Sequence, residues 1–514
     1  MVFHVIKQAI STLLSRLSGL IRDVVTAYYL GADRTSDAFF ASFRVPNSIR
    51  KLIGEGPLSA SFVPIFIDQS IKNKKRAREF AGTTLVVITL VGFIVATVLF
   101  IFMDSFLSLI VPGLINEPEV FATAVRLSRV SVPFMGLTCC VAVLGGITNA
   151  NQSFFSFGIT PMILNFSMIG CVLVFGKLFP NTAFALSFGI VLGGMLQILF
   201  MLRACQKIGM LPIIKFKNPT SVRLATRKMF TKLVAIVFGQ GIFQINMFVD
   251  GIFASFTAKT QSYLYYSERL SQFVITLIGH TLGMVSLPML SMYIKKNKPQ
   301  EALQVQNKCI SWLTLWSIPA AVSLFYLSHD IVKMIYCRGS FLTEDVFYVG
   351  NMLKITCCVI PIYAINKILY SSIYSLEKVG FAVIAGLVAV SVNLAINLLL
   401  INRIQHYYVV ISSAVSAVVE CAILLFVLKY KYKFLLFLKK DFVTLLIVIP
   451  VSFAVGSLSF LCFNAMPYSI WLKLLIIIPI TIFVYTVIVS LFGIINIISL
   501  LRSVKKHVYA SKSG

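Results

Sequence analysis

The stretch Leu85–Phe102, LVVITLVGFIVATVLFIF, carries no charged residue and shows no regular alternation of polar and apolar side chains. An apolar run of about 20 residues is long enough to cross ~30 Å of hydrocarbon as a helix. Lipid offers the backbone no hydrogen-bond partner, so a spanning segment must be a helix or part of a closed barrel. Barrel strands alternate polar and apolar residues. Leu85–Phe102, Ala382–Ile401 and Leu472–Phe492 do not, so the sequence predicts membrane-spanning helices.

The overall composition excludes a soluble protein. The 514 residues are 58% hydrophobic and only 12% charged, whereas soluble domains average roughly 45–50% apolar and about 25% charged residues. The net charge of +27 would raise the question of nucleic acid in a soluble chain. Here the cations gather between the apolar runs, as in the cytoplasmic loops of membrane proteins. We therefore expect membrane lipids as partners and no nucleic acid.

Apolar runs recur from end to end and predict an all-α polytopic membrane protein of about fourteen transmembrane helices. The predicted spans are residues 5–30, 36–70, 81–111, 121–149, 157–178, 182–205, 233–256, 260–293, 305–327, 346–375, 379–401, 406–429, 442–464 and 472–500.

The basic clusters predict the orientation. Each dense cluster follows an even-numbered span: residues 72–78, 203–232, 295–298, 429–440 and 502–512. Loops rich in Lys and Arg stay in the cytoplasm. The sequence therefore predicts a multi-pass protein of the cytoplasmic (inner) membrane with both termini in the cytoplasm.

An internal repeat divides the chain. Arg44–Gly54 reads RVPNSIRKLIG, Arg269–Gly279 reads RLSQFVITLIG, and a proline follows each, at Pro64 and Pro288. Repeated halves are how many transporters build a central site. We expect two pseudo-symmetric six-helix lobes, a basic loop between them and two further helices with a basic tail: residues 1–205, 206–232, 233–430 and 431–514.

Charged residues inside the predicted spans point to the substrate. An arginine at the bilayer centre costs at least ~2.5–3.5 kcal/mol, so it should serve a polar cavity or a partner. Guanidinium groups bind phosphate oxygens bidentately, and the sequence predicts a phosphate-bearing anion. The candidate binding residues are Arg16, Arg22, Arg50, Lys51 and Arg269, and the candidate supporting residues are Asp23, Asp37, Arg44, Glu55 and Glu268.

Structural roles remain as alternatives for several of these residues. Asp23 is placed to form a buried ion pair with Arg16 or Arg22, and Glu268 with Arg269. Arg50 and Lys51 are alternatively near a helix end, where long cationic side chains reach the interface. Asp37 lies close to the predicted outer interface. Its alternative role is to cap the N-terminus of its own helix there.

No catalytic motif is present. The chain lacks a P-loop, an H-E-x-x-H sequence, a nucleophile elbow and C-x-x-C spacing. We expect a monomeric transporter without a cofactor, driven by sodium, protons or the membrane potential. Asp250, Asn393 and Asn397 offer hard oxygen ligands for a cation. Alternatively, the asparagines only bridge helices.

The sequence also resembles the MurJ (MviN) family. The opening SRLSGLIRD of Ser15–Asp23 is similar to the family pattern S-R-x-x-G-x-x-R-D, and YYSERL of Tyr265–Leu270 is similar to its Y-A-D-R-L motif. Further matching stretches are Thr35–Phe40, Pro46–Asn47, Arg50–Lys51, Glu55–Gly56 and Phe62–Pro64. The departures are Pro57, Gln272 and Tyr374–Lys378.

This resemblance implies a lipid II flippase of the multidrug/oligosaccharidyl-lipid/polysaccharide exporter superfamily. Its substrate would be the undecaprenyl-pyrophosphate-linked peptidoglycan precursor, moved from the inner to the outer leaflet by alternating access. Arg16, Arg22, Arg50 and Arg269 would be cavity cations and Asp37 an outer gate residue. Alternatives are an exporter of another polyprenyl-linked saccharide, a cation-coupled drug antiporter of the same fold, or a membrane enzyme acting on lipid-linked sugars.

Overall fold

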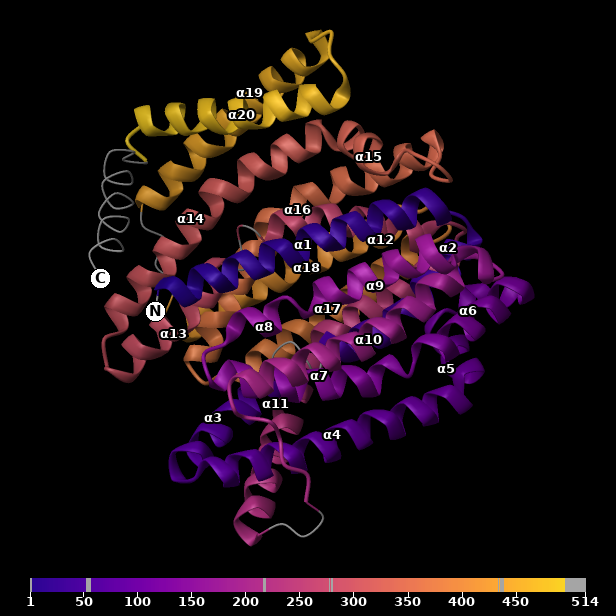
Figure 1. The fold of residues 1–514 in the computed structure, drawn as a ribbon. Helices are drawn as coiled ribbons and strands as arrows, with labels where there is room; N and C mark the ends of the chain where they lie inside the picture. Colours follow the sequence, from indigo (N-terminus) through magenta and orange to yellow (C-terminus); the bar gives the residue numbers. More distant parts are fainter. Residues whose placement is uncertain are drawn as a thin grey trace. The chain divides into compact units, whose positions relative to one another are not determined.

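The computed structural model describes residues 2–51, 57–215, 219–276, 278, 281–432, 434 and 439–494. Every regular element within these ranges is a helix (Figure 1). The prediction of an all-α protein is therefore confirmed. The predicted site residue Glu55 lies outside the described residues.

The elements of the first part of the chain are α1 (Val2–Leu30), α2 (Arg34–Ile49), α3 (Pro57–Lys72), α4 (Lys74–Ile101), α5 (Met103–Ile110), η2 (Pro112–Asn116), α6 (Pro118–Ser131), α7 (Phe134–Ala150), α8 (Phe154–Gly158), α9 (Thr160–Phe175), η3 (Gly176–Leu178) and α10 (Thr182–Lys207). Those that follow are α11 (Thr220–Ala254), α12 (Thr260–Ile275), α13 (Thr281–Lys295), α14 (Pro299–Tyr326), α15 (Ser328–Tyr336), α16 (Thr343–Ser375), α17 (Val379–Leu400), α18 (Tyr408–Phe426), η5 (Val427–Lys431), α19 (Lys439–Ala465) and α20 (Ile470–Leu491).

Ten helical segments among the described residues are long and apolar enough to cross a membrane. The chain is therefore a multi-pass membrane protein. The predicted spans outside these ten are 5–30, 36–70, 233–256 and 260–293. These four carry nearly all the predicted site residues.

Two of the polar spans each contain two described helices. In the first, α2 ends at Ile49 and α3 begins at Pro57. In the second, α12 ends at Ile275 and α13 begins at Thr281. π-Helical turns follow both α2 and α12, and such turns commonly interrupt helices at functional sites. Of the residues between α2 and α3, 52–56 lie outside the described part of the chain.

The chain forms two compact units. The first contains residues 1–266, 336–346 and 393–409, and the second contains residues 267–335, 347–392 and 410–514. These units are defined by how compactly the chain folds and not by internal repetition. They therefore do not test the two repeat lobes, which stay a prediction.

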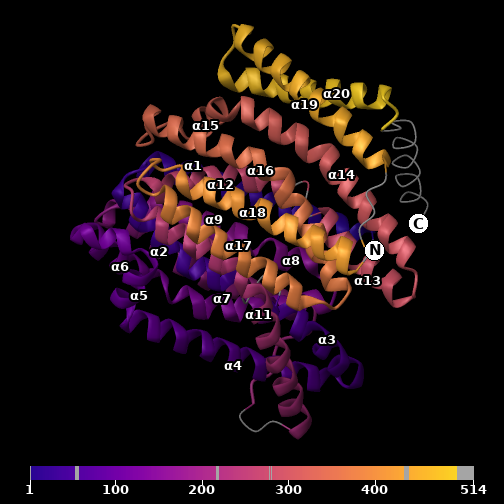
Figure 2. The same cartoon turned by 180° about the vertical axis from the view of Figure 1, so that it is seen from behind.

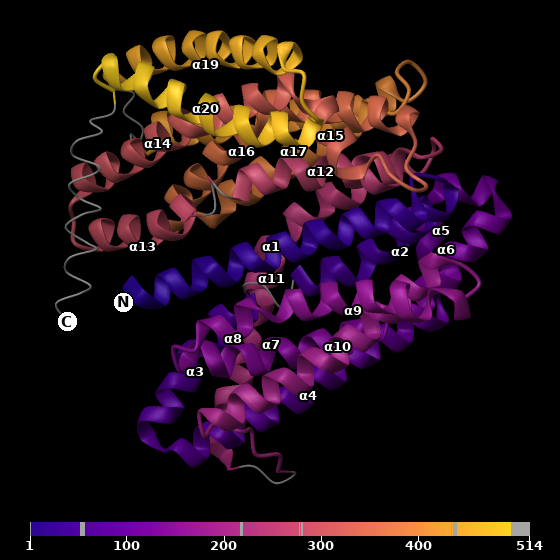
Figure 3. The same cartoon turned by 45° about the horizontal axis from the view of Figure 1, so that its top comes forward.

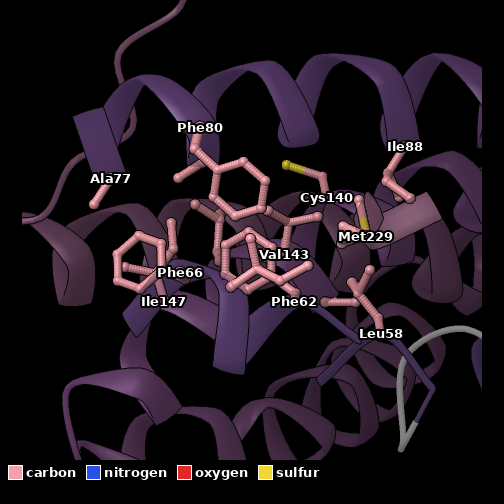
Figure 4. Close-up of a cluster of buried hydrophobic side chains, with 14 of the residues drawn as sticks. Leu58, Phe62, Phe66, Ala77, Phe80, Ile88, Cys140, Val143, Ile147 and Met229 are labelled. Atoms are coloured by element: carbon pink, nitrogen blue, oxygen red, sulfur yellow. The ribbon is translucent and has the colours of Figure 1, made fainter. Parts of the chain in front are cut away.

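Aromatic residues of α3 and α4 fill the core of the first unit (Figure 4). The Phe62 ring stacks on Phe66 and Phe80 with centroids 5.4 and 5.3 Å apart. On α7, a Cβ added to Gly146 would lie 2.7 Å from the Phe62 ring. Glycine is therefore required there for the close packing of α3 on α7. Small residues at helix contacts permit this packing in a membrane, where lipid is as apolar as the side chains.

The second unit ends in a helical hairpin. Helix α19 packs on α14 and on α20 (Figures 2 and 3). The Tyr485 hydroxyl of α20 donates a 2.6 Å hydrogen bond to the Leu315 carbonyl of α14. Large apolar side chains such as Phe453, Leu475 and Phe483 point outward from this hairpin. An apolar outer surface is expected for helices surrounded by lipid.

Candidate functional site

Arg22 and Asp23 of α1 form a buried ion pair. Their exposed fractions are 5% and 2%. The Arg22 Nη2 and Nε atoms donate to Asp23 Oδ1 over 2.6 and 3.1 Å. The structural pair considered for Arg22 is therefore present in this conformation.

Arg22 also connects α1 to two other helices. Its Nη1 donates a 3.0 Å hydrogen bond to Asn165 Oδ1 of α9, and its Nη2 donates over 2.8 Å to the Tyr265 hydroxyl of α12. The Tyr265 hydroxyl in turn donates to Asp23 Oδ1 over 2.9 Å. The Tyr265 ring stacks on Phe40 of α2, with centroids 3.9 Å apart. All three guanidinium nitrogens thus bind protein groups, and an incoming phosphate would have to replace some of them.

Asp37 links α2 to the beginning of α12. Its side chain is fully buried and accepts hydrogen bonds from the Lys259 and Ser262 backbone N–H groups over 2.6 and 3.0 Å. The Ser262 hydroxyl donates a third bond over 2.7 Å. The first N–H groups of a helix have no partner within it, and a carboxylate there also meets the positive end of the helix dipole.

The capping alternative for Asp37 needs a correction. The N-cap of its own helix is Asp33, whose side chain accepts from the Ser36 N–H over 2.7 Å. Asp37 instead satisfies the N-terminus of a helix more than 200 residues away in the sequence. It is therefore a tertiary contact between α2 and α12.

Further contacts hold the first turns of α12. The Tyr263 hydroxyl donates over 2.9 Å to Asp345, a buried residue in the first turn of α16. The Lys259 Nζ lies 3.4 Å from the same carboxylate. The Tyr266 hydroxyl donates over 3.0 Å to the Gly31 carbonyl, just beyond α1. Together with Asp37 and Tyr265, these contacts anchor this end of α12; we call them the α12 anchor.

The cations of α2 lie near α11. The Arg44 Nη1 donates a 3.4 Å hydrogen bond to the Met247 carbonyl. A Cβ added to Gly251 would lie 1.7 Å from the same Nη1, so only glycine leaves room for this guanidinium position. The Lys51 Nζ lies 3.8 Å from Met247 Sδ, and Arg50 donates over 3.0 Å to Asn47 Oδ1 of its own helix. All three cations are partly exposed.

The remaining predicted cations lie on α1 and α12. Arg16 is exposed on α1. Glu268 and Arg269 are half-buried on α12. Arg269 follows Tyr265 by four residues and therefore lies on the same face of the helix, one turn further on. Tyr265 belongs to the network of Arg22, so α12 carries both a partner of Arg22 and a second arginine.

The predicted cation ligands come together between α11 and α17. Asn393 Nδ2 lies 2.9 Å from Asp250 Oδ1 and 3.0 Å from Asn246 Oδ1. Asn397 donates to the Asn393 carbonyl over 3.0 Å, and its own buried Oδ1 has no hydrogen-bond partner. The asparagines thus bridge the two helices, and a spare oxygen also fits a hard cation. No cluster of three or more His, Cys, Asp or Glu residues occurs in the described part of the chain.

Sequence reasoning missed several of these residues. Asn246 precedes Asp250 by one helical turn, a spacing that places both on one face and was a usable signal. Asn165 is a polar residue inside the predicted span 157–178, which was a weaker signal. Ser262 and Tyr265 are ordinary helix residues in sequence, and only the tertiary fold brings them to Asp37 and Arg22.

Comparisons with known proteins place the chain in a family. The sequence profile described as "Lipid II flippase MurJ" matches residues 26–492. A protein of Rickettsia prowazekii (strain Madrid E), named probable lipid II flippase MurJ, is 28% identical over 410 residues, which are 80% of each chain. A protein of Aquifex aeolicus (strain VF5) with the same name is 30% identical over 373 residues, which are 72% of each chain.

Solved structures agree on the fold. A lipid II flippase MurJ in an inward closed conformation superposes with a TM-score of 0.79 at 23% identity, covering 95% of this chain and 98% of the other. A multidrug resistance MATE family transporter of the MOP superfamily, inward-facing, gives a TM-score of 0.64 at 10% identity, covering 90% and 99%. Sequence identities of 23% and 10% show that the chain shares the fold of these two proteins and do not extend to their function. The family profile covers most of the sequence, and the chain therefore belongs to the lipid II flippase MurJ family, a family of transporters and not of enzymes.

Proposed function

We propose that this protein moves lipid II, the undecaprenyl-pyrophosphate-linked peptidoglycan precursor, from the inner to the outer leaflet of the cytoplasmic membrane by alternating access. The family gives the substrate class. The observation that carries the proposal is the buried Arg22, held by Asp23, Asn165 and Tyr265 where α1, α9 and α12 meet. Asn165 and Tyr265 are neutral partners, and the oxygens of an anionic substrate could replace them on the guanidinium group.

Pyrophosphate recognition would proceed by partner exchange at Arg22. The dehydrated phosphate needs cationic hydrogen-bond donors during its crossing, because an unpaired buried charge is very costly. Phosphate oxygens would replace Asn165 and Tyr265, while Asp23 keeps the guanidinium in position. Arg16, Arg50 and Lys51 would add positive charge along α1 and α2, and Arg269 would add it from α12.

This charge distribution supports an anionic substrate over a cationic drug. A drug antiporter that exports cations would be opposed by arginines along its path, since like charges repel. The structures of the MATE transporters share the fold, and a shared fold does not imply a shared substrate.

The α12 anchor supports a conformation closed at one end. Helix α1 runs from the N-terminus to Leu30, and the anchor lies near its far end. If the N-terminus is cytoplasmic, as the basic loops predict, this closed end faces outward. Release of substrate to the outer leaflet would then require Asp37 and Asp345 to give up their contacts with α12. A bound ligand shifts such an equilibrium only by binding one state better.

Asp250, Asn393 and Asn397 would form the coupling-ion site, with Asn246 as a fourth ligand. The unpartnered Asn397 Oδ1 supports this role, because a buried carbonyl oxygen without a donor is costly unless something binds it. Sodium suits these oxygen ligands. The membrane potential would add ~2.3 kcal/mol per charge moved through 100 mV. In this proposal the two repeat lobes rock as a monomer, with both termini in the cytoplasm.

Complementation tests the proposal. The chain is expressed in a strain whose own lipid II flippase is depleted, and growth and cell shape are followed. We expect the wild-type chain to restore growth and the Arg22→Ala variant to fail at equal membrane abundance. A wild-type chain that inserts well but never restores growth would point to another polyprenyl-linked substrate.

A further inference from the structure

Glu420 is a carboxylate within a membrane span and has no role in the sites described above. It lies on α18, inside the candidate span Tyr408–Lys431. Lys429, at the basic end of this span, is nine residues further on, or about 13 Å along a helix. Glu420 therefore lies well within the hydrocarbon thickness, where an ionised carboxylate is costly and is usually functional.

The hydrogen-bond partners of Glu420 are neutral. The Tyr370 hydroxyl donates to its Oε1 over 2.5 Å, and the Asn366 Nδ2 donates to its Oε2 over 3.1 Å. The same Nδ2 lies 3.2 Å from the Ala417 carbonyl. Lys367 is on α16 next to Asn366, but it forms no ion pair with Glu420 among the described residues. The carboxylate is thus stabilised by dipoles and not by a cation.

Asn366 supplies a second observation. Its side chain is 4% exposed, and its Oδ1 is buried without a hydrogen-bond partner. A protonated Glu420 would carry an O–H that needs an acceptor. Rotating the Asn366 amide by a half turn would present its Oδ1 to that O–H. The same pair of side chains can therefore satisfy both the ionised and the protonated form of the carboxyl group.

No group that carries a charge near pH 7 acts on Glu420 among the residues that the structure describes. The titratable groups that act on Glu420 or respond to it are Tyr370, Tyr374 and Cys421, all neutral near pH 7. Residues 379–392 of α17 contain no titratable side chain. The buried residues that α13 and α14 contribute to the adjoining core are Leu290, Ala302 and Leu303, and the only titratable residue among the described, partly buried hydrophobic side chains of these two helices that pack against this core is Tyr293. A proton is therefore the simplest charge-balancing ligand for Glu420.

We propose that Glu420, Asn366 and Tyr370 form a proton-binding site inside the membrane that takes up and releases a proton during transport. The site uses different residues from the Asp250 site, so the protein carries a proton site besides its candidate cation site. Proton binding by Glu420 does not depend on the proposed flippase function. The coupling of proton binding to transport does rest on that function.

Carbodiimide labelling tests proton binding directly. Dicyclohexylcarbodiimide modifies protonated carboxyl groups in apolar surroundings, and mass spectrometry locates the product. We expect Glu420 of the full-length protein in liposomes to be modified about tenfold faster near pH 6 than near pH 9, because the acid form reacts. The exposed Glu377, in the loop after α16, is the matched control and should not share this pattern. Absent or pH-independent modification of Glu420 would overturn the proposal.

The pH profile of transport tests the coupling. Glu420→Gln keeps one oxygen that can accept from the Tyr370 hydroxyl, and its amide N–H can donate to Asn366 Oδ1 as a protonated carboxyl group would, but it cannot exchange a proton. We expect the wild-type flipping rate to change severalfold between about pH 6 and pH 9 and the variant rate to stay constant. If Glu420 has only a structural role, the Glu420→Gln variant should show the same pH profile of flipping as the wild type. The Glu420→Leu variant should then be unstable or absent from the membrane. If the wild type does not flip lipid II at all, the proposed function fails and the labelling result alone decides the proton site.

Discussion

Helices α2 and α3 and helices α12 and α13 share one backbone design but differ in charge. Each pair consists of two helices of similar length, and both the ends of α2 and α12 and the starts of α3 and α13 are about 225 residues apart. This spacing matches the sequence repeat of Arg44–Gly54 and Arg269–Gly279. The residues between the two helices of each pair lie partly outside the described residues, at 52–56 and at 277, 279 and 280.

The charges are not repeated. Helix α2 and the turn after it contain Arg44, Arg50 and Lys51, whereas the matching part of α12 contains Arg269 beside Glu268. Their contacts differ as well, because α2 contributes the Asp37 carboxylate and α12 contributes backbone N–H donors. In the proposed function, the first helix pair would therefore contribute more positive charge to anion binding than the second. The variants below test this asymmetry.

The largest effect is expected for Arg22→Ala, which should abolish complementation. The variant removes the buried cation that is proposed to bind phosphate, and Arg22→Lys should restore only part of the activity because lysine lacks the bidentate fork. Growth of the depleted strain is the measurement, with membrane abundance determined in parallel.

A second variant separates binding from folding in this test. Arg22→Ala leaves Asp23 buried without its cation, which is itself destabilising. The double variant Arg22→Ala, Asp23→Ala removes both charges and should accumulate normally, yet remain inactive. Restored growth in the double variant would show that Arg22 serves only to neutralise Asp23.

Asp37→Ala should loosen the α12 anchor. A hydrogen bond to a charged group contributes ~1.5–3 kcal/mol, so the Lys259 and Ser262 amides should exchange with deuterium at least about tenfold faster. Asp33→Ala is the matched control, because Asp33 caps α2 itself and should leave the α12 amides unchanged. Equal exchange in both variants would remove Asp37 from the anchor.

Asp250→Ala and Asn397→Ala should reduce the sodium dependence of flipping in vesicles. Each change removes one oxygen ligand from the candidate site, and Asn246→Ala should act in the same direction, because it removes the fourth proposed ligand. The rate is measured with and without a sodium gradient. Full activity and unchanged sodium response in both main variants would leave the asparagines as helix bridges only.

The smallest effect is expected for Gly251→Ala. The new methyl group would displace the tip of Arg44, which can move because it is the far end of a flexible side chain. The flipping rate should therefore fall only severalfold, and thermal stability should barely change. Gly170→Ala on α9 is the control, because its added Cβ meets no atom within 4 Å. An inactive Gly251→Ala protein would assign Arg44 a much larger role than the other cations of α2.

The sequence predicted the helical fold because apolar runs of spanning length are a local signal. It also predicted Arg22, Asp37 and Asp250 as candidates, because charges inside such runs are costly wherever their partners lie. The partners themselves were not predictable. Asn165 and Tyr265 are 143 and 243 residues from Arg22 in the sequence, and only helix packing brings them together.

Glu420 shows the same limit in the second unit. A single carboxylate in an apolar helix was visible in the sequence, but its neutral partners on α16 were not. The charge of these partners decides whether Glu420 forms an ion pair or binds a proton. Such contacts depend on how two helices face one another, which neither composition nor periodicity encodes.

The most direct test of the central claim is flipping of fluorescent lipid II in liposomes that contain purified protein. The claim is that arginines from both matching helix pairs and from α1 carry the pyrophosphate across the membrane. The account predicts that the wild-type protein flips lipid II and that a well-inserted Arg22→Ala, Arg269→Ala double variant does not. Flipping by the double variant at the wild-type rate would contradict it.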